Sequence, residues 1–344
     1  MSVLFVDTFV TGITVMVDTP EGVAFILDIH ADDRSPSSRV DDYPETVLHK
    51  LKLALEDASD NNLLSIWGGD VFNRPHIQSD YIKARIMALC QTAKYKPLVI
   101  PGNHDMSGEI LGPSDTLWLL GISGCVKLIT SSKPWGVFDM RRGDEIIRVG
   151  LGGTPFGQDV PTTLPWNERV DLGLWATHDN FRFQSHYEDK KSYDFHAIPG
   201  VDMVVNGHLH HASALVEAVS DDGHVTTWMN PGSLARTKSN EKNRIPSVFF
   251  IHTDGSTRTH AIHVDGEASV FSSSSGRASL TTQNTGGAKA EEEGRNRFTN
   301  MLSNNFIDEK SVGELLDQAA SEGKINPGMR NWLEQIALQA DQRK

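Results

Sequence analysis

The feature that most constrains this chain is a series of five short motifs of histidine, carboxylate and glycine residues, each of which follows an apolar run. The runs are rich in β-prone residues and bounded by Gly or Pro, a pattern typical of buried strands. Because the carboxyl ends of neighbouring strands meet along one edge of an α/β sheet, we expect the motifs to converge on one crevice. In chain order they are Asp28-Ile29-His30, Gly69-Asp70, Gly102-Asn103-His104-Asp105, Thr177-His178 and Gly207-His208-Leu209-His210.

The spacing inside the motifs fits metal coordination. In Asp28-x-His30 and in His208-x-His210, the two residues would point to the same side of an extended chain. Imidazole and carboxylate groups are ligands that Mn, Fe and Zn ions accept, and a carboxylate can bridge two ions. One such motif alone more often marks a core or surface histidine than a ligand, but five in order favour a metal centre. Three glycines are expected to let the backbone turn sharply beside the ligands, namely Gly69, Gly102 and Gly207.

This arrangement resembles the calcineurin-like metallophosphoesterase superfamily, whose motifs run D-x-H, G-D, G-N-H-D/E, H and G-H-x-H. The resemblance implies an α/β fold, a four-layer α/β/β/α sandwich, with a centre of two divalent metal ions. Mn²⁺ is the expected metal, and Mg²⁺, Fe²⁺ and Zn²⁺ are alternatives. The implied ligands are Asp28, His30, Asp70 and His210 for one ion, and Asp70, Asn103, His178 and His208 for the other.

The resemblance also implies catalytic roles for two residues of the third motif. His104 would not bind metal but would face the two ions and stabilise or protonate the leaving group. Asp105 would hold the His104 ring in one tautomer and raise its basicity. For both residues, an ordinary hydrogen bond within the loop is the alternative.

Residues around the motifs are similar to the SbcD-type DNA nucleases, which act with SbcC-type ATPases. Val71 and Phe72 follow Asp70 as in the G-D-[LV]-F of these nucleases, and Asp105 stands where Ser/Thr phosphatases have Glu. The expected function is therefore metal-dependent exonuclease and endonuclease activity on DNA, in repair or recombination. The alternative is a calcineurin-like phosphodiesterase or phosphatase that acts on a small nucleotide or a phosphoprotein. A non-catalytic scaffold is disfavoured because no expected ligand is missing.

Several positions near the motifs allow two interpretations. Many nuclease members have His or Asp where this chain has Asn73, and His76 either substitutes for it or is a surface histidine. The segment 230–233 is either an ordinary β-turn or a direct substrate contact. His211 is expected to support the site from outside or to face solvent.

Composition sets the cellular context. The chain of 344 residues has a net charge of −13, whereas proteins that hold DNA alone present a basic face. We therefore expect weak DNA binding by the isolated chain and a partner that supplies most of the affinity. No stretch approaches the roughly 20 apolar residues of a membrane span. The start of the chain lacks signal-peptide features, and Cys90 and Cys125 fit a reducing compartment, so a cytoplasmic protein is expected.

The organisation predicted along the chain has three parts. Helices are expected after Asp42 and over residues 79–90, and short strands from residue 128 onward predict a second sheet. Residues 1–19 are expected to form an extra strand pair. The three parts are a nuclease domain at 1–265, a linker rich in Ser and Gly at 266–294 and a helical segment at 295–344.

The helical segment is the expected docking site for a partner. Ser311-x-x-Glu314 is a capping box that predicts one helix, and Asn326-Pro327 predicts the start of a second. The resemblance implies that these helices dock on an SbcC-like coiled-coil ATPase. Packing on the catalytic domain is the alternative, and a homodimer is a further assembly to test.

Overall fold

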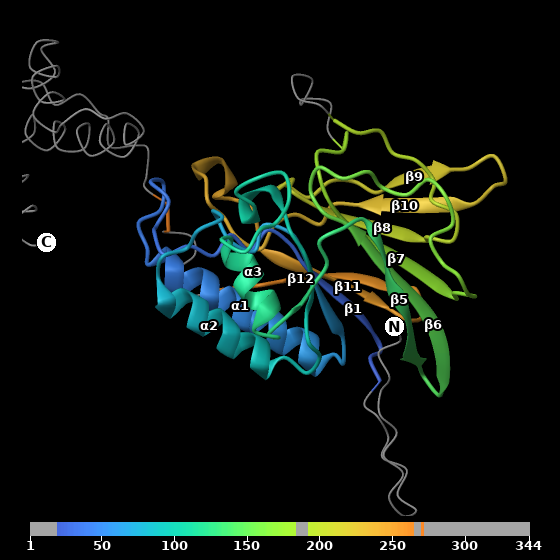
Figure 1. Cartoon of the computed structure of the whole chain (residues 1–344), viewed down its shortest axis with the longest axis horizontal. Coiled ribbons are helices and arrows are strands. Elements are labelled where there is room, and N and C mark those ends of the chain that lie inside the picture. Colours follow the sequence, from blue (N-terminus) through green and yellow to red (C-terminus); the bar gives the residue numbers. More distant parts are fainter. Residues whose placement is uncertain (1–18, 184–191, 265–269, 272–344) are drawn as a thin grey trace, which may run out of the picture. The chain divides into compact units, whose positions relative to one another are not determined.

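The computed structural model describes residues 19–183, 192–264 and 270–271 (Figure 1). The chain divides into two units, Met1–Ser273 and Ser274–Lys344, and the described residues all belong to the first.

Some expectations from the sequence therefore lie outside the described residues. They include the helices of the C-terminal segment, most of the linker and almost all of the expected N-terminal strand pair.

The first sheet has six strands in the order β12-β11-β1-β2-β3-β4. The strands from β1 to β4 run parallel, and β11 and β12 complete one edge in antiparallel pairing. Both β1 and β2 are buried along their whole length, which explains why their sequences are apolar apart from Ser65. The bounds are β1 Gly22–Ile26, β2 Leu64–Gly68, β3 Leu98–Ile100, β4 Lys127–Leu128, β11 Ser247–His252 and β12 Thr257–Ala261.

The second sheet also has six strands, in the order β5-β6-β7-β8-β10-β9. Its four inner strands are parallel, and β5 and β9 pair antiparallel at the two edges. This confirms the second sheet expected from residue 128 onward. The bounds are β5 Lys133–Arg142, β6 Glu145–Thr154, β7 Leu172–His178, β8 Met203–Gly207, β9 Val216–Val219 and β10 Val225–Met229.

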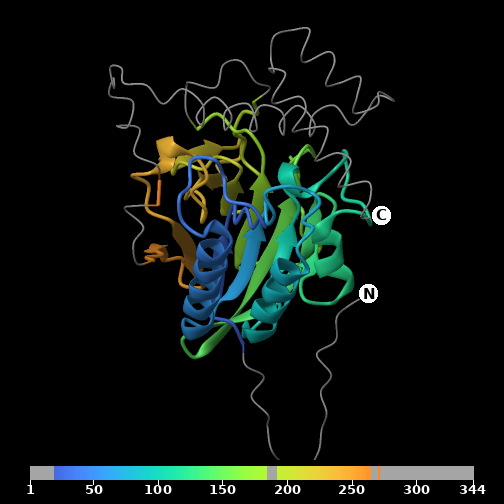
Figure 2. The ribbon, with the colours of Figure 1, turned by 90° about the vertical axis from the view of Figure 1, so that its left-hand side faces the viewer.

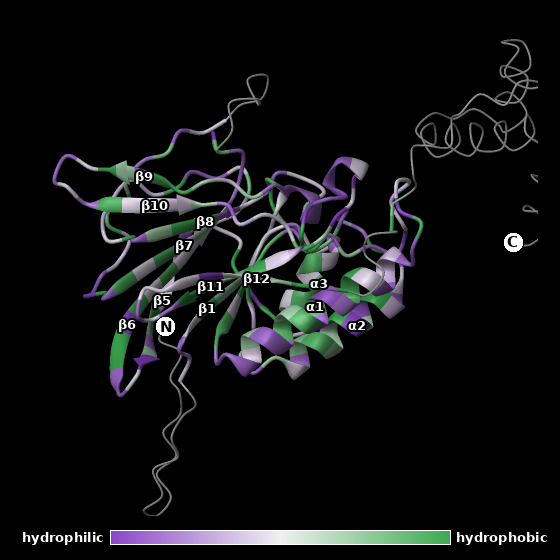
Figure 3. Ribbon diagram, turned by 180° about the vertical axis from the view of Figure 1, so that it is seen from behind, coloured by the Kyte–Doolittle hydropathy of each residue, from purple (hydrophilic) through white to green (hydrophobic). Residues whose placement is uncertain are grey.

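Three helices cover the outer face of the first sheet, and Figure 2 shows them in front of its strands. They are α1 Tyr43–Asp60, α2 Asp80–Thr92 and α3 Thr116–Ile122. Asp42 and Ser79 cap α1 and α2, as the sequence predicts. The helices carry both hydrophilic and hydrophobic residues, as expected when one face packs on a sheet (Figure 3). None of the helices in the described part of the chain combines the length and apolar character of a membrane span.

The first sheet separates two layers of the core. Along β1, Ala24 and Ile26 pack with the helices, whereas Val23 and Phe25 pack between the two sheets. This alternation follows from the two-residue repeat of a strand. The expected α/β/β sandwich is thereby confirmed.

The outer face of the second sheet is covered differently. An aromatic cluster packs there, with Trp175 from β7, Trp228 from β10, and Trp166 and Phe181 from loops. Within the described residues, the fourth layer is thus made by loops, where the four-layer expectation would place helices.

The parallel strands determine where the functional side chains lie. Three motifs follow β1, β2 and β3 of the first sheet, and the other two lie at the ends of β7 and β8 of the second. The crevice is consequently shared by two sheets rather than built on the edge of one.

Thr226 provides a test of how β10 is anchored. Its buried hydroxyl accepts from Ile198 N at 2.8 Å and donates to Val201 O at 2.9 Å. We expect Thr226→Val to lower the free energy of unfolding by about 1–3 kcal/mol, because both backbone groups lose a buried partner. Chemical denaturation measures this, with Thr227→Val on the same strand as the control, expected to change stability by less than about 0.5 kcal/mol. Equal effects of the two substitutions would contradict the assignment.

Candidate metal centre

The structure brings together all of the residues that the sequence predicts as metal ligands. Six of the seven, together with His104, form overlapping groups, and within each group the potential ligand atoms lie within 4.8 Å of one another; Asn103 lies beside His208. Those groups are Asp28, His30 and His210; His30, Asp70 and His104; and Asp70, His178 and His208.

The first group lies on the loops that follow β1 and β8. His30 Nε2 and His210 Nε2 are 3.0 Å apart, and they lie 3.9 Å and 4.0 Å from Asp28 Oδ1. The Asp28 carboxylate also accepts from the backbone N–H of His208 at 3.0 Å. Three ligand-type atoms thus face one another at the distances expected around a single ion.

Asp70 lies between this group and the next. Its Oδ2 is 3.7 Å from His30 Nε2 and 3.3 Å from His178 Nε2, and its Oδ1 accepts from His104 N at 2.8 Å. This is the place that a bridging carboxylate requires.

The group of Asp70, His178 and His208 is completed by an amide. The Asn103 side chain begins the short 3-10 helix Asn103–Asp105, and its Oδ1 lies 2.9 Å from His208 Nδ1. The phenyl ring of Phe156 flanks this side of the centre, with its centroid 5.6 Å from that of His208.

A hydrogen bond between the two sheets orients His178. Its Nδ1 donates to the carbonyl of Gly68 on β2 at 2.7 Å, which leaves Nε2 directed at Asp70. Within the described part of the chain, this Nε2 is buried without a hydrogen-bond partner, as is Nδ1 of His30.

Three motif glycines make room for these contacts. A Cβ on Gly69 would lie 2.2 Å from His178 Nδ1, and one on Gly102 would lie 2.2 Å from Asp70 Oδ1. A Cβ on Gly207 would lie 2.5 Å from the Gly68 carbonyl oxygen. Only Gly69, with φ of +93°, also needs glycine for its backbone conformation. The expected role in sharp turns is therefore wrong for Gly102 and Gly207, which are needed for close approach.

Left-handed conformations also occur at the candidate ligands themselves. Asp28 and His30 have φ of 49°, Asp70 has φ of 50° and His208 has φ of 75°. The expectation of an extended D-x-H segment is thus wrong, although both side chains do reach the same group. Such conformations are costly for residues with a Cβ and concentrate at functional sites.

The structure corrects the role expected for Asp105. Its buried carboxylate accepts from the backbone N–H groups of Val71, Phe72 and Gly102, at 3.2, 2.9 and 2.9 Å. Burial raises the pKa of Asp105 to about 7, and these amides act in the opposite direction. Asp105 therefore shapes the loop and does not orient the His104 ring.

The His104 ring is oriented by a backbone group instead. Its Nδ1 donates to the carbonyl of Asn73 at 2.8 Å, and its ring stands edge-on to His30 with centroids 4.9 Å apart. The side chain is exposed at the mouth of the centre. The Asn73 amide is directed away, since its Nδ2 donates to Asp32 at 2.7 Å.

Glu241 is a supporting residue that sequence reasoning missed. Its Oε1 accepts from His210 Nδ1 at 2.6 Å, and its Oε2 accepts from Thr237 N and Lys238 N. It lies in a second 3-10 helix, Ser239–Glu241, after no apolar run, so no local pattern marked it.

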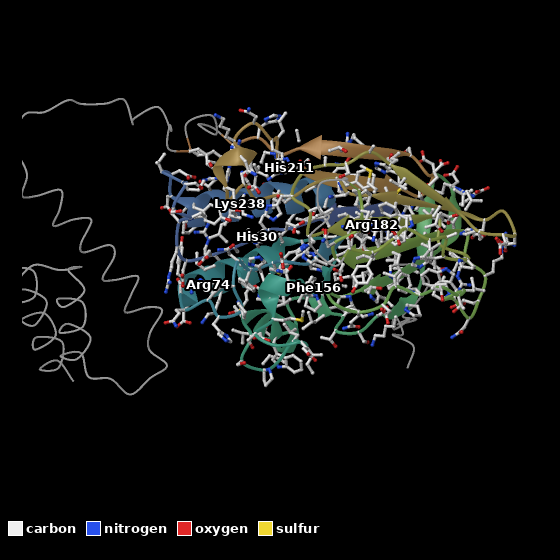
Figure 4. The ribbon with its side chains drawn as sticks, turned by 90° about the horizontal axis from the view of Figure 1, so that it is seen from above. His30, Arg74, Phe156, Arg182, His211 and Lys238 are labelled. Carbon is white, nitrogen blue, oxygen red and sulfur yellow. The ribbon has the colours of Figure 1, made fainter. Side chains whose placement is uncertain are left out.

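The positions left open by the sequence are now placed. His76 Nδ1 donates to the Ser114 carbonyl in an exposed loop, and the residue takes no part in the centre. His211 is exposed, and it is labelled together with His30 in the view of Figure 4. The Asn230 side chain is buried and donates to the carbonyls of Leu209 and His211, so it holds the last motif in place.

Electrostatic interactions divide the histidines into two kinds. Burial alone would lower the pKa of His178, but the Asp70 carboxylate raises it to about 10. Burial and the neighbouring His178 lower the pKa of His208 to about 3. Burial would lower the pKa of His210, and its hydrogen bond to Glu241 raises it.

These residues fit a divalent metal centre. The donor set combines imidazole nitrogens, carboxylates and one amide oxygen, and borderline divalent ions accept all of these groups. His178 Nε2 lies 3.3 Å from Asp70 Oδ2, a separation at which both atoms could bind one cation between them. The assignment of individual residues to two ions stays a prediction.

Metal binding should release protons. Below pH of about 10 the metal-free His178 carries a proton that a ligand must lose. We expect Mn²⁺ binding near pH 7.5 to release at least one proton, and affinity to rise with pH. Calorimetry in buffers of different ionisation enthalpy measures the release, with His211→Ala as a control that behaves like the unsubstituted chain. A binding enthalpy independent of buffer would contradict the prediction.

Comparison with known proteins places the chain in a family. A model of the calcineurin-like phosphoesterase family matches residues 23–212. A search of curated proteins gives no significant match. Among solved structures, a 5'-nucleotidase precursor from Thermus thermophilus is similar, with 16% identity and a TM-score of 0.42. That match covers 72% of this chain and 55% of the other, so this chain spans about half its length. Because the family model covers more than half of the 344 residues, the chain belongs to the calcineurin-like phosphoesterase family.

Proposed function

We propose that this chain is the nuclease subunit of an SbcCD-like complex and hydrolyses phosphodiester bonds of DNA. Hydrolysis of phosphoester bonds follows from the family of the chain, whose members are hydrolases that use divalent metal ions. The observation that carries the proposal is the cluster of Asp28, Asp70 and four motif histidines around one crevice, with His104 exposed at its mouth.

The expected ligand set would hold two divalent ions. Such ions polarise a phosphoryl oxygen and make water available as a nucleophile near neutral pH. The exposed His104 can reach the leaving oxygen through Nε2, because Nδ1 is engaged by the Asn73 carbonyl. Asp105 holds the loop that carries His104 in place, because its carboxylate accepts hydrogen bonds from three backbone amides.

Basic side chains lie around the centre. Figure 4 shows Arg74, Lys238 and Arg182 on different sides of His30 when the centre is viewed from above. Arg74 is paired with Asp32 and Asp33, and Arg182 is paired with Asp194, which reduces their net attraction for phosphate. This supports a nuclease that depends on a partner for most of its DNA affinity.

A small-nucleotide substrate is the second candidate, and a cavity favours it. A cavity of about 690 Å³ adjoins His178 and is lined further by Asp179, Phe181, Tyr193 and Asp194. Its size suits a drug-sized ligand. None of the described residues that line it is Lys or Arg, so it would accept a base or another uncharged group rather than a phosphate.

DNA degradation tests the nuclease hypothesis. We expect Mn²⁺-dependent degradation of linear duplex DNA that is stronger with the ATPase. We also expect His104→Ala to lower the rate by about 10²–10⁴, because a leaving-group acid is lost. The control His76→Ala removes a histidine outside the centre, and the metal content of both variants should match the parent. Cleavage of only small diesters, with or without the ATPase, would contradict the nuclease proposal.

The C-terminal segment is proposed to dock on the ATPase. Deletion of residues 295–344 should leave hydrolysis of bis(p-nitrophenyl) phosphate unchanged, because every candidate ligand precedes that segment. The same deletion should abolish co-purification with the ATPase. Retained co-purification would contradict docking, and lost hydrolysis would favour packing on the catalytic domain.

A further inference from the structure

Val270 and Phe271 pack on the catalytic unit, although they fall within the residues expected to form the linker. Val40 N donates to the carbonyl of Val270 at 2.9 Å, and Arg39 and Phe271 form an isolated antiparallel bridge. Val270 is buried. The catalytic unit therefore extends at least to Phe271.

The Phe271 ring contacts two buried arginines. The guanidinium carbon of Arg39 lies 5.1 Å from the ring centroid, and that of Arg236 lies 5.4 Å from it. Both arginines are almost fully buried, at 6% and 3% exposure. Cation–π contacts of desolvated guanidinium groups are stronger than those at a surface.

Arg39 connects Phe271 to His30 through contacts with Tyr43. The Arg39 guanidinium forms two hydrogen bonds with Asp41, at 2.7 and 2.6 Å, and also stacks 5.1 Å over the ring of Tyr43. The Tyr43 hydroxyl donates to the backbone carbonyl of His30 at 2.8 Å. One arginine thus holds the side chain that fixes the backbone of a candidate ligand.

Arg236 connects Phe271 to His210 through the loop that contains Glu241. Its carbonyl accepts from Arg39 at 2.7 Å, and its guanidinium donates to the Lys242 carbonyl at 2.7 Å. These two bonds fix both ends of the loop that contains Glu241. The carboxylate of Glu241 in turn accepts from His210 Nδ1.

We propose that Phe271 is a positioning residue for the group formed by Asp28, His30 and His210. It holds the two arginines whose partners orient His30 and His210, and it acts on neither ligand directly. Asp70, His178 and Asn103 are not reached by these contacts. The inference rests on the proposed metal centre.

The test measures Mn²⁺ binding by electron paramagnetic resonance on the full-length chain. Phe271→Leu keeps an apolar side chain but removes the aromatic ring. We expect it to weaken one of two bound ions roughly tenfold, the lower end of the range for groups that orient metal ligands. Phe271→Trp should restore the affinity. Tyr81→Leu is the matched control, because it removes a ring that contacts Arg85 on the outside of α2.

Two backgrounds identify the affected ion. With His208→Ala, the group of Asp28, His30 and His210 remains, and Phe271→Leu should still weaken binding. With His210→Ala, Phe271→Leu should have no effect. Unchanged binding in Phe271→Leu, or equal weakening in both backgrounds, would overturn the inference. If the unsubstituted chain binds no Mn²⁺, the proposed centre and this inference both fail, whereas two bound ions that ignore Phe271 overturn this inference alone.

Discussion

The hydrogen bond from His178 Nδ1 to the Gly68 carbonyl is the interaction on which the rest of the centre depends. It joins β7 of one sheet to β2 of the other, and it does so at the carboxyl ends where the ligands gather. Gly69, Gly102 and Gly207 surround this ring and leave no space for a Cβ. The two sheets can therefore approach closely enough for Asp70 to face histidines from both of them. The glycines of the motifs are thus best understood as a consequence of this contact.

Much of the architecture could be predicted because it depends on local patterns. Largely apolar runs marked β1, β2 and β8, and a motif residue one to three positions after each run, Asp28, Asp70 and His208, proved to lie in the crevice. The partners of Asp105 could not be predicted, because two of its three amide donors come from the loop after another strand. Glu241 was missed for a similar reason, since only the folded chain brings its polar loop to His210.

The residues that favour the nuclease branch act inside the protein. Val71 and Phe72 are both fully buried, and their backbone amides donate to Asp105. Their influence on catalysis is therefore indirect, through the position of the loop that carries His104. Because neither side chain is exposed, neither can contact a substrate directly, and substrate choice must depend on exposed groups around the crevice.

The left-handed backbone at the ligands has a consequence for how such a chain can change. Among the described residues, five non-glycine residues have positive φ, and Asp28, His30, Asp70 and His208 are four of them. Glycine would relax the backbone at each of these positions and would also delete a candidate ligand. Selection for a more stable chain and selection for an active one therefore act in opposite directions at these four sites. The rest of the fold must supply enough stability to retain conformations that the isolated segments would abandon.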